Sequence, residues 1–188
     1  MNYKFLISFL ILSLLLASCN NINNSFNVAP IFSDKMVFQQ AQSNPIWGTS
    51  SPHSDIKISS SWGESVNTKA DSSGHWSVKL PTPVYGKGSN NKKQTVKVSN
   101  GYKTITIKDV LIGEVWLASG QSNMQWYMDE CEGCVINQTK EIETSNNDMI
   151  RMFSVPHELT GDAIKHKKWM SASAETTGKF SATAYYFA

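Results

Sequence analysis

The spacing of hydrophobic residues changes near Val110, and this change constrains the fold more than any other feature of the sequence. Before that point, short runs of β-branched and aromatic residues alternate with polar ones, as in strands with one buried face. Turn-forming residues separate the runs, and Asn100-Gly101 is a strong hairpin signal. Evenly spaced short strands without a helical stretch predict a β-sandwich over residues 28–110. The expected strands cover residues 46–48, 56–59, 75–80, 95–98 and 103–107.

After that point, the apolar residues run almost without interruption from 110 to 118. Such a run is typical of a strand that is buried on both faces of an α/β sheet. A tight polar turn follows at Gly120–Met124, and we expect a short helix from Gln125 onward. Residues 149–155 predict a second buried strand, and residues 181–188 predict the beginning of a helix.

Two strands and part of a helix cannot form a parallel sheet with both faces covered. We therefore expect residues 111–188 to be the first, incomplete portion of an α/β domain. The predicted fold class is β plus α/β, with the β-sandwich first and the truncated α/β domain second.

The N-terminus reads as a bacterial lipoprotein leader. Lys4 supplies a short positive region, and residues 5–17 form an apolar stretch of 13 residues. A bilayer-spanning helix needs about 20 residues, so this stretch is expected to be part of a signal peptide. The sequence Leu16-Ala-Ser-Cys19 resembles a lipobox, so residues 1–18 are predicted to be removed and Cys19 to be lipidated. The alternative is an ordinary secretory signal that happens to contain a cysteine.

The residues after Cys19 predict where the anchored protein resides. Residues 19–27 are polar and low in complexity, which is typical of a tether. Asn20 differs from the Asp that favours retention in the inner membrane of bacteria, so we expect the outer membrane of the cell envelope. Several acyl chains on one residue would give a stable anchor.

Overall charge excludes one class of partner. The chain has 17 Lys and Arg against 15 Asp and Glu, a formal net charge of +2, and no long run of like charges. Nucleic-acid binding would need a basic face or stripe, so no nucleic-acid partner is expected. The oligomeric state is left open.

The polar turn is the segment most suited to chemistry. Between a strand and a helix, Ser122 would stand at the carboxyl edge of a sheet, where ligands bind in open α/β folds. A serine exposed there can attack an ester carbonyl while a backbone N–H holds the oxyanion. Met124 occupies the place of the second glycine in a Gly-x-Ser-x-Gly elbow, so the motif differs from that one. The alternative is that Ser122 only caps the helix.

Residues 113–126 around this turn resemble the nucleophile block of the sialate O-acetylesterase family, which belongs to the SGNH (GDSL-like) hydrolases. Three further segments resemble the same family in order along the chain: 31–40 with 46–48, 148–156, and Trp169 with 180–187. The resemblance implies a flavodoxin-like α/β domain in which Ser122 is the catalytic nucleophile. It also implies that Gln121 and Asn123 contact the substrate, an O-acetylated sugar or glycan, and that no cofactor takes part.

In that family, the base and its acidic partner come from an Asp-x-x-His block that lies beyond the residues seen in this sequence. Ser122 would form an acetyl-enzyme, but this chain alone is expected to be inactive. Two alternatives remain open: a non-catalytic, carbohydrate-binding envelope lipoprotein or inactive fragment, and an enzyme whose His and Asp come from a second chain. His53 and His75 are expected to be surface residues, and His157 and His166 lie in the polar stretch after the second predicted strand. Of these, His157 could lie on the same edge as Ser122, where the alternative is a loop residue with ordinary hydrogen bonds.

Cys131 and Cys134 are spaced as C-x-x-C after the nucleophile turn. Zinc would need two more ligands, and a thioredoxin-like site would need a strand before the motif and a helix directly after it. We therefore expect a local disulfide or two free thiols, and no metal site.

Overall fold

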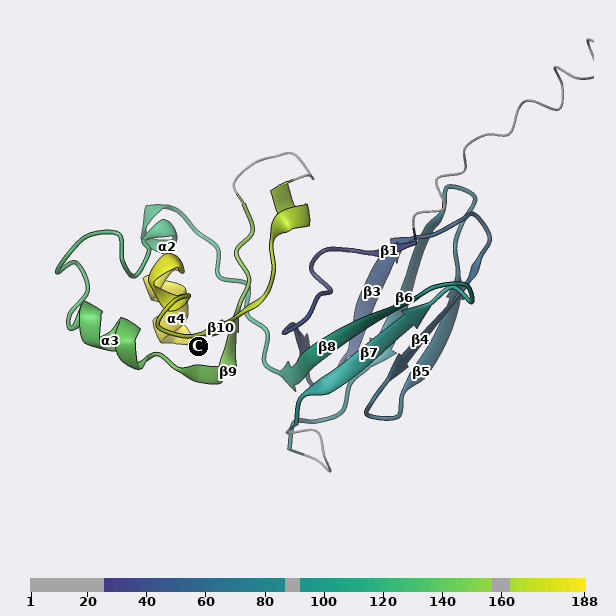
Figure 1. The fold of residues 1–188 in the computed structure, drawn as a ribbon, viewed down its shortest axis with the longest axis horizontal. Coiled ribbons are helices and arrows are strands. Elements are labelled where there is room, and N and C mark those ends of the chain that lie inside the picture. The colour runs from purple at the N-terminus through teal and green to yellow at the C-terminus, as the bar shows by residue number, and fades with distance from the viewer. Residues whose placement is uncertain (1–25, 87–91, 157–162) are drawn as a thin grey trace, which may run out of the picture.

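The computed structural model describes residues 26–86, 92–156 and 163–188. Up to residue 113 the described chain forms two sheets, which we call the β region (Figure 1). The first sheet is antiparallel, in the order β1 (Asn27–Val28), β3 (Ser43–Thr49) and β6 (His75–Pro81). The second has the order β2 (Val37–Gln39), β8 (Thr104–Gly113), β7 (Gln94–Ser99), β4 (Asp55–Ser60) and β5 (Ser65–Lys69).

The larger sheet is mixed, because β2 lies parallel to β8 while its other strands pair antiparallel. The inward residues of both sheets meet in one hydrophobic core, as the alternation in the sequence predicted. In β4, for example, Ile56 and Ile58 are buried while Lys57 between them is exposed. The prediction of a β structure in this region is therefore confirmed. The core includes Phe38, Ile46, Ile56, Ile58, Trp76, Leu80, Val96, Val98, Ile107 and Val110.

The predicted hairpin at Asn100-Gly101 joins β7 to β8. Gly101 has a φ of 86°, a left-handed conformation that glycine adopts without steric cost. The Asn100 carboxamide oxygen accepts from the backbone N–H groups of Tyr102 and Lys103, at 3.2 and 2.8 Å. This side chain therefore closes the turn and fixes the register of the two strands.

The apolar run from 110 to 118 is not one strand, so that prediction is wrong. β8 ends at Gly113, which pairs with Gln39 at the end of β2. Val110, Leu111 and Ile112 are buried, whereas Leu117 is 90% exposed. The reason is pairing: within the described part of the chain, no strand lies beside residues 114–118, so the backbone leaves the sheet there.

The remainder of the described chain, residues 114–156 and 163–188, forms what we call the C-terminal region. It contains α2 (Ser122–Gln125), α3 (Gln138–Thr144), β9 (Asn147–Met152), β10 (Met170–Ala172) and α4 (Ala182–Phe187). Single 3-10 turns occupy Ala163–His166 and Thr177–Lys179. None of the helices in the described ranges is long and apolar enough to cross a membrane.

The strand predicted at 149–155 exists as β9, but it is not buried on both faces. It pairs antiparallel with β10, and Met149 is 49% exposed. An antiparallel pair with a solvated face differs from the parallel α/β sheet that we expected, and the described residues show no beginning of such a sheet. The helix predicted at 181–188 is confirmed as α4, where the Ser181 hydroxyl caps the first turn by accepting from Ala184 N–H at 3.3 Å.

Candidate active site

Ser122 is the first residue of α2 and is exposed. The helix was expected from Gln125 onward, but it begins at Ser122 and ends at Gln125. Gln121 occupies the N-cap position, and no side-chain hydrogen bond caps this helix. The interpretation of Ser122 as a mere helix cap is therefore wrong. Its hydroxyl makes no hydrogen bond to any other residue that the structure describes, so it stands free at the surface of the turn.

Backbone hydrogen bonds hold the turn in shape. The Gln121 carbonyl accepts from Met124 N–H at 2.9 Å and from Gln125 N–H at 3.3 Å. Gly120 has no room for a side chain, since a Cβ there would lie 2.9 Å from Cγ of Met124. Gln121 and Asn123 flank the serine, and both are exposed. All three predicted site residues are thus presented to solvent on one short turn.

The turn is fastened to α4, about 60 residues further along the chain. Thr183 Oγ1 donates to the Asn123 carbonyl at 3.0 Å, and Ala182 N–H donates to the Trp126 carbonyl at 2.8 Å. Met128 N–H donates to the Phe180 carbonyl at 3.0 Å, and Tyr127 forms an isolated bridge with Ser181. These bonds make the start of α4 the support of the candidate nucleophile.

A second support comes from the β region. Gln39 and Gln40 donate from their side-chain nitrogens to the two carboxylate oxygens of Glu114, at 2.7 and 2.6 Å. Gln39 Oε1 in turn accepts from Val115 N–H at 2.8 Å. We call these four residues the glutamine clamp. The two amide donors hold the pKa of Glu114 below its usual value, and the clamp fixes the chain at the point where it leaves β8 toward Ser122.

Exposed aromatic side chains lie close to the turn in the sequence. Trp116 precedes it and contacts Phe187 of α4 edge to face, with ring centroids 5.1 Å apart. Trp126 and Tyr127 follow α2 and are 42% and 46% exposed. Sequence reasoning identified neither this surface nor the glutamine clamp, although Glu114 and the two glutamines all fall within the segments that resembled the family.

The described histidines are not placed to act as the base. His53 and His166 are exposed, and the ring Nδ1 of His75 lies 2.8 Å from the Ser73 hydroxyl. In residues 26–86, 92–156 and 163–188, no hydrogen bond links a histidine to Ser122. His157 and Cys19 lie outside the described residues, so their predicted roles are untested.

Cys131 and Cys134 form a disulfide, which selects one of the two states expected for them. Among the described residues, no group of three or more His, Cys, Asp or Glu side chains is arranged to hold a metal ion. The disulfide lies in the loop between α2 and α3, and this loop also donates Gly133 N–H to Gln138 Oε1 at 3.1 Å.

Comparison with known proteins identifies the relatives of the chain. No protein-family model matches it. It is 32% identical over 138 residues to a mouse sialate O-acetylesterase, covering 69% of this chain and 24% of the relative. The human sialate O-acetylesterase is 29% identical over 182 residues, covering 90% of this chain and 34% of the relative. The chain is a distant homologue of the sialate O-acetylesterases. The family resemblance of the sequence blocks is thereby confirmed.

A solved structure supports this relationship. A carbohydrate acetylesterase from Xanthomonas citri superposes with a TM-score of 0.72 at 30% identity, covering 86% of this chain and 36% of that protein. The chain therefore spans about a quarter to a third of the length of these relatives.

Proposed function

We propose that this chain is the N-terminal part of a carbohydrate O-acetylesterase and that Ser122 is its nucleophile. The observation that carries the proposal is the turn itself: an exposed serine with an uncommitted hydroxyl, flanked by Gln121 and Asn123 and fastened to α4. The homology to acetylesterases over most of the chain supports the reaction type. On this proposal, residues 111–188 begin an SGNH flavodoxin-like domain whose further strands would lie beside residues 114–118.

The chemistry follows from the turn. Ser122 Oγ attacks the acetyl carbonyl carbon of an O-acetylated sugar. The bond between this carbon and the sugar oxygen then breaks, and the sugar leaves as an alcohol that carries the proton given up by the serine hydroxyl. An acetyl-enzyme remains, and water then attacks it to release acetate and restore the serine. The backbone N–H of Ser122 makes no hydrogen bond within the described residues, and it can therefore donate to the oxyanion that forms on the acetyl oxygen. Gln121 and Asn123 would orient the sugar.

Proton transfer needs a base, and none of the described histidines contacts Ser122. The proposal therefore assigns the base and its acidic partner to residues outside the described ones: further along the gene product, on a second chain or, for the base alone, at His157. Sequencing the gene past codon 188 separates these cases, because an Asp-x-x-His block in the same reading frame would supply both groups.

Acetate release tests the proposal directly. The complete gene product is assayed with an O-acetylated sialic acid, and acetate is measured enzymatically. Ser122→Ala is expected to lower turnover by at least about a thousandfold, because the covalent route is lost. Ser119→Ala changes another exposed serine, three residues earlier, and is the matched control that should retain activity. Undiminished acetate release by Ser122→Ala would remove the serine from this role.

We further propose that the mature protein is anchored to the bacterial outer membrane through Cys19, with residues 20–25 as the tether. The predicted tether 19–27 extends too far, because Phe26 is buried in the core of the β region and Asn27 begins β1. Cys19→Ser should move the protein from the membrane to the soluble fraction of lysed cells. Mass spectrometry of the N-terminal peptide should find acyl chains on Cys19. An unmodified N-terminus at any other residue contradicts the anchor.

A further inference from the structure

The helix α2, which carries Ser122, has only four residues and depends on its surroundings for its shape. No side-chain hydrogen bond caps its beginning, and the backbone becomes extended at Trp126, directly after its end. Isolated helices of fewer than about 12 residues are marginal in water, because forming the first turn is unfavourable. The orientation of Ser122 is therefore fixed by contacts that come from elsewhere in the chain.

The first turn of α4 supplies such contacts at the end of α2. A helix leaves its last carbonyl groups without partners inside the helix. Thr183 Oγ1 donates to the Asn123 carbonyl at 3.0 Å, and Ala182 N–H donates to the Trp126 carbonyl at 2.8 Å. The bond from Ala182 is made by the backbone. Of these two bonds, only the one from Thr183 depends on the identity of a side chain.

The hydrogen bond from Thr183 completes the fixation of one peptide group. This peptide joins Asn123 to Met124, and its N–H, on Met124, donates to the Gln121 carbonyl at 2.9 Å. Its oxygen, on Asn123, accepts from Thr183. One side of the planar group is thus held within the turn and the other side by α4. Because Asn123 follows Ser122 directly, a fixed peptide here limits the rotation of the backbone beside the serine.

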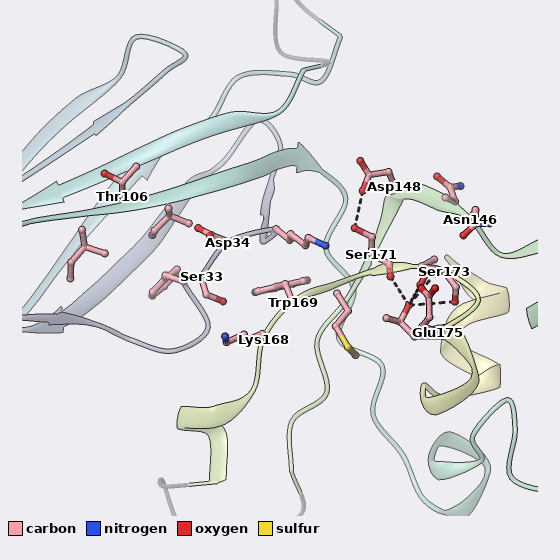
Figure 2. Close-up of a pocket in the computed structure, with 18 residues that line it drawn as sticks. Ser33, Asp34, Thr106, Asn146, Asp148, Lys168, Trp169, Ser171, Ser173 and Glu175 are labelled. Atoms are coloured by element: carbon pink, nitrogen blue, oxygen red, sulfur yellow. Dashed lines mark hydrogen bonds between the residues drawn. The ribbon is translucent and has the colours of Figure 1, made fainter.

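The segment that leads into α4 is itself held in place. Figure 2 shows part of this segment at one wall of a groove of about 1020 Å³, where Ser171, Ser173 and Glu175 lie beside one another. The Ser173 hydroxyl donates to Glu175 Oε2 at 2.9 Å. Further along, the Gly178 carbonyl accepts from Asp129 N–H at 2.9 Å, which ties the segment to the loop after α2. The start of α4 is therefore a firm support for the hydroxyl of Thr183.

From these contacts we infer that Thr183 is a positioning residue for Ser122, an inference that rests on the proposed function. The Thr183 hydroxyl holds the peptide after Asn123, and this peptide sets the backbone angles at which Ser122 Oγ faces the acetyl carbonyl. Misplacement of a reacting group by about 1 Å can cost about a hundredfold in rate. Thr183 touches no reacting atom and acts through Asn123.

Hydrogen exchange tests whether Thr183 orders the turn. It is measured by mass spectrometry on the complete gene product, over peptides that cover residues 119–127. Thr183→Val removes the hydroxyl at nearly constant shape, and Thr183→Ser keeps it. We expect exchange in these peptides to be at least about tenfold faster in Thr183→Val and parental in Thr183→Ser, because exchange follows local opening.

Thr144→Val is the matched control. Thr144 Oγ1 also donates to a backbone carbonyl, that of Lys140 at 2.8 Å, but this bond lies within α3. The control should leave exchange over residues 119–127 at the parental rate. The peptides of β9 report on overall stability and should exchange at the parental rate in all three variants.

Acetate release by the same proteins tests the positioning role. We expect Thr183→Val to lower kcat about tenfold and to change KM by less than about twofold, because alignment of the serine is lost while binding of the sugar is retained. Thr183→Ser and Thr144→Val should keep the parental kcat.

Four results would overturn the inference: parental exchange or parental kcat in Thr183→Val, failure of Thr183→Ser to restore both, an equal effect in Thr144→Val, or faster exchange that extends equally to β9. Absence of acetate release from the parent would overturn the proposed function instead. The exchange rates would then still show whether Thr183 holds the turn that carries Ser122.

Discussion

The guanidinium group of Arg151 in β9 donates two hydrogen bonds to the carboxylate of Asp109 in β8, from Nη2 to Oδ1 at 2.9 Å and from Nη1 to Oδ2 at 3.3 Å. The Arg151 side chain is fully buried, and that of Asp109 is 22% exposed. Asp148 and Lys93 extend the pair into a network of four charges. This network joins the C-terminal region to the β region.

Loss of Arg151 should destabilise the protein strongly, because it leaves Asp109 without its main partner in a largely buried place. We expect Arg151→Ala to lower the free energy of unfolding by about 3 kcal/mol, measured by urea denaturation. Lys93→Gln is the comparison within the same network. The Lys93 side chain is 53% exposed, so its removal should cost much less than the removal of Arg151. Equal, small losses in the two variants would contradict the importance of the buried pair.

The same network predicts a loss of stability in acid through Asp148. A hydrogen bond from Lys93, with a further one from Ser171, lowers the pKa of Asp148 from 3.8 to about 2. A carboxyl whose folded pKa is lowered stabilises the fold above its unfolded pKa, and this contribution disappears as the pH falls through the folded pKa. The contribution of Asp148 should therefore be complete above about pH 4 and fade toward about pH 2.

Comparing the parent with Asp148→Asn isolates this contribution from that of other acids. The difference in unfolding free energy between the two proteins should shrink between about pH 4 and about pH 2 and stay constant above that range. Asp55→Asn is the control, since Asp55 pairs with Lys69 on the surface with its side chain 88% exposed. A difference that does not change with pH would show that Asp148 is not held in its charged form.

The β region could be predicted from the sequence because apolar and polar residues alternate along a strand when only one face of the strand is buried. Ile56 and Ile58 lie inside and Lys57 outside, as the pattern required. Three strands were not predicted, for local reasons. β5 (Ser65–Lys69) is a polar strand at the sheet edge, and β1 (Asn27–Val28) and β2 (Val37–Gln39) have only two and three residues.

The C-terminal region was predicted less well, because hydrophobicity does not report where strand pairing ends. Leu111 and Leu117 belong to one apolar run, yet the first is buried and the second is 90% exposed. In the candidate site, the turn around Ser122 is local and was found from sequence. The glutamine clamp joins residues about 75 positions apart, and a contact over such a distance leaves no short sequence motif from which it could be predicted.

Gly48 in β3 is expected to tolerate no side chain. A Cβ there would lie 2.1 Å from the Asn27 carbonyl oxygen and 2.7 Å from a ring carbon of Trp76. Since the backbone of β1 cannot withdraw without losing its pairing, Gly48→Ala should lower the unfolding free energy by about 1–3 kcal/mol. Gly113→Ala is the matched strand control, as its nearest neighbour would be Val37 at an ordinary 3.9 Å. A melting temperature of Gly48→Ala equal to that of the control would contradict this packing.

The glutamine clamp should order the segment that leads to Ser122. Glu114→Ala removes the acceptor of both amide donors and frees Gln39, whose Oε1 holds Val115 N–H. We expect the amide of Val115 to exchange with solvent at least about tenfold faster in this variant, because exchange follows local opening. The exchange rate is measured by mass spectrometry on peptides that cover residues 114–121. Overall stability should change little, since the carboxylate is exposed.

Glu132→Ala is the matched control, because it removes another exposed carboxylate from the C-terminal region and leaves the clamp intact. Its exchange at Val115 should equal that of the parent. Gln39→Ala should reproduce the Glu114→Ala result, since it removes the acceptor of Val115 N–H directly. If Glu114→Ala exchanges at the parental rate while Gln39→Ala exchanges faster, Gln39 alone holds the segment and Glu114 has no positioning role.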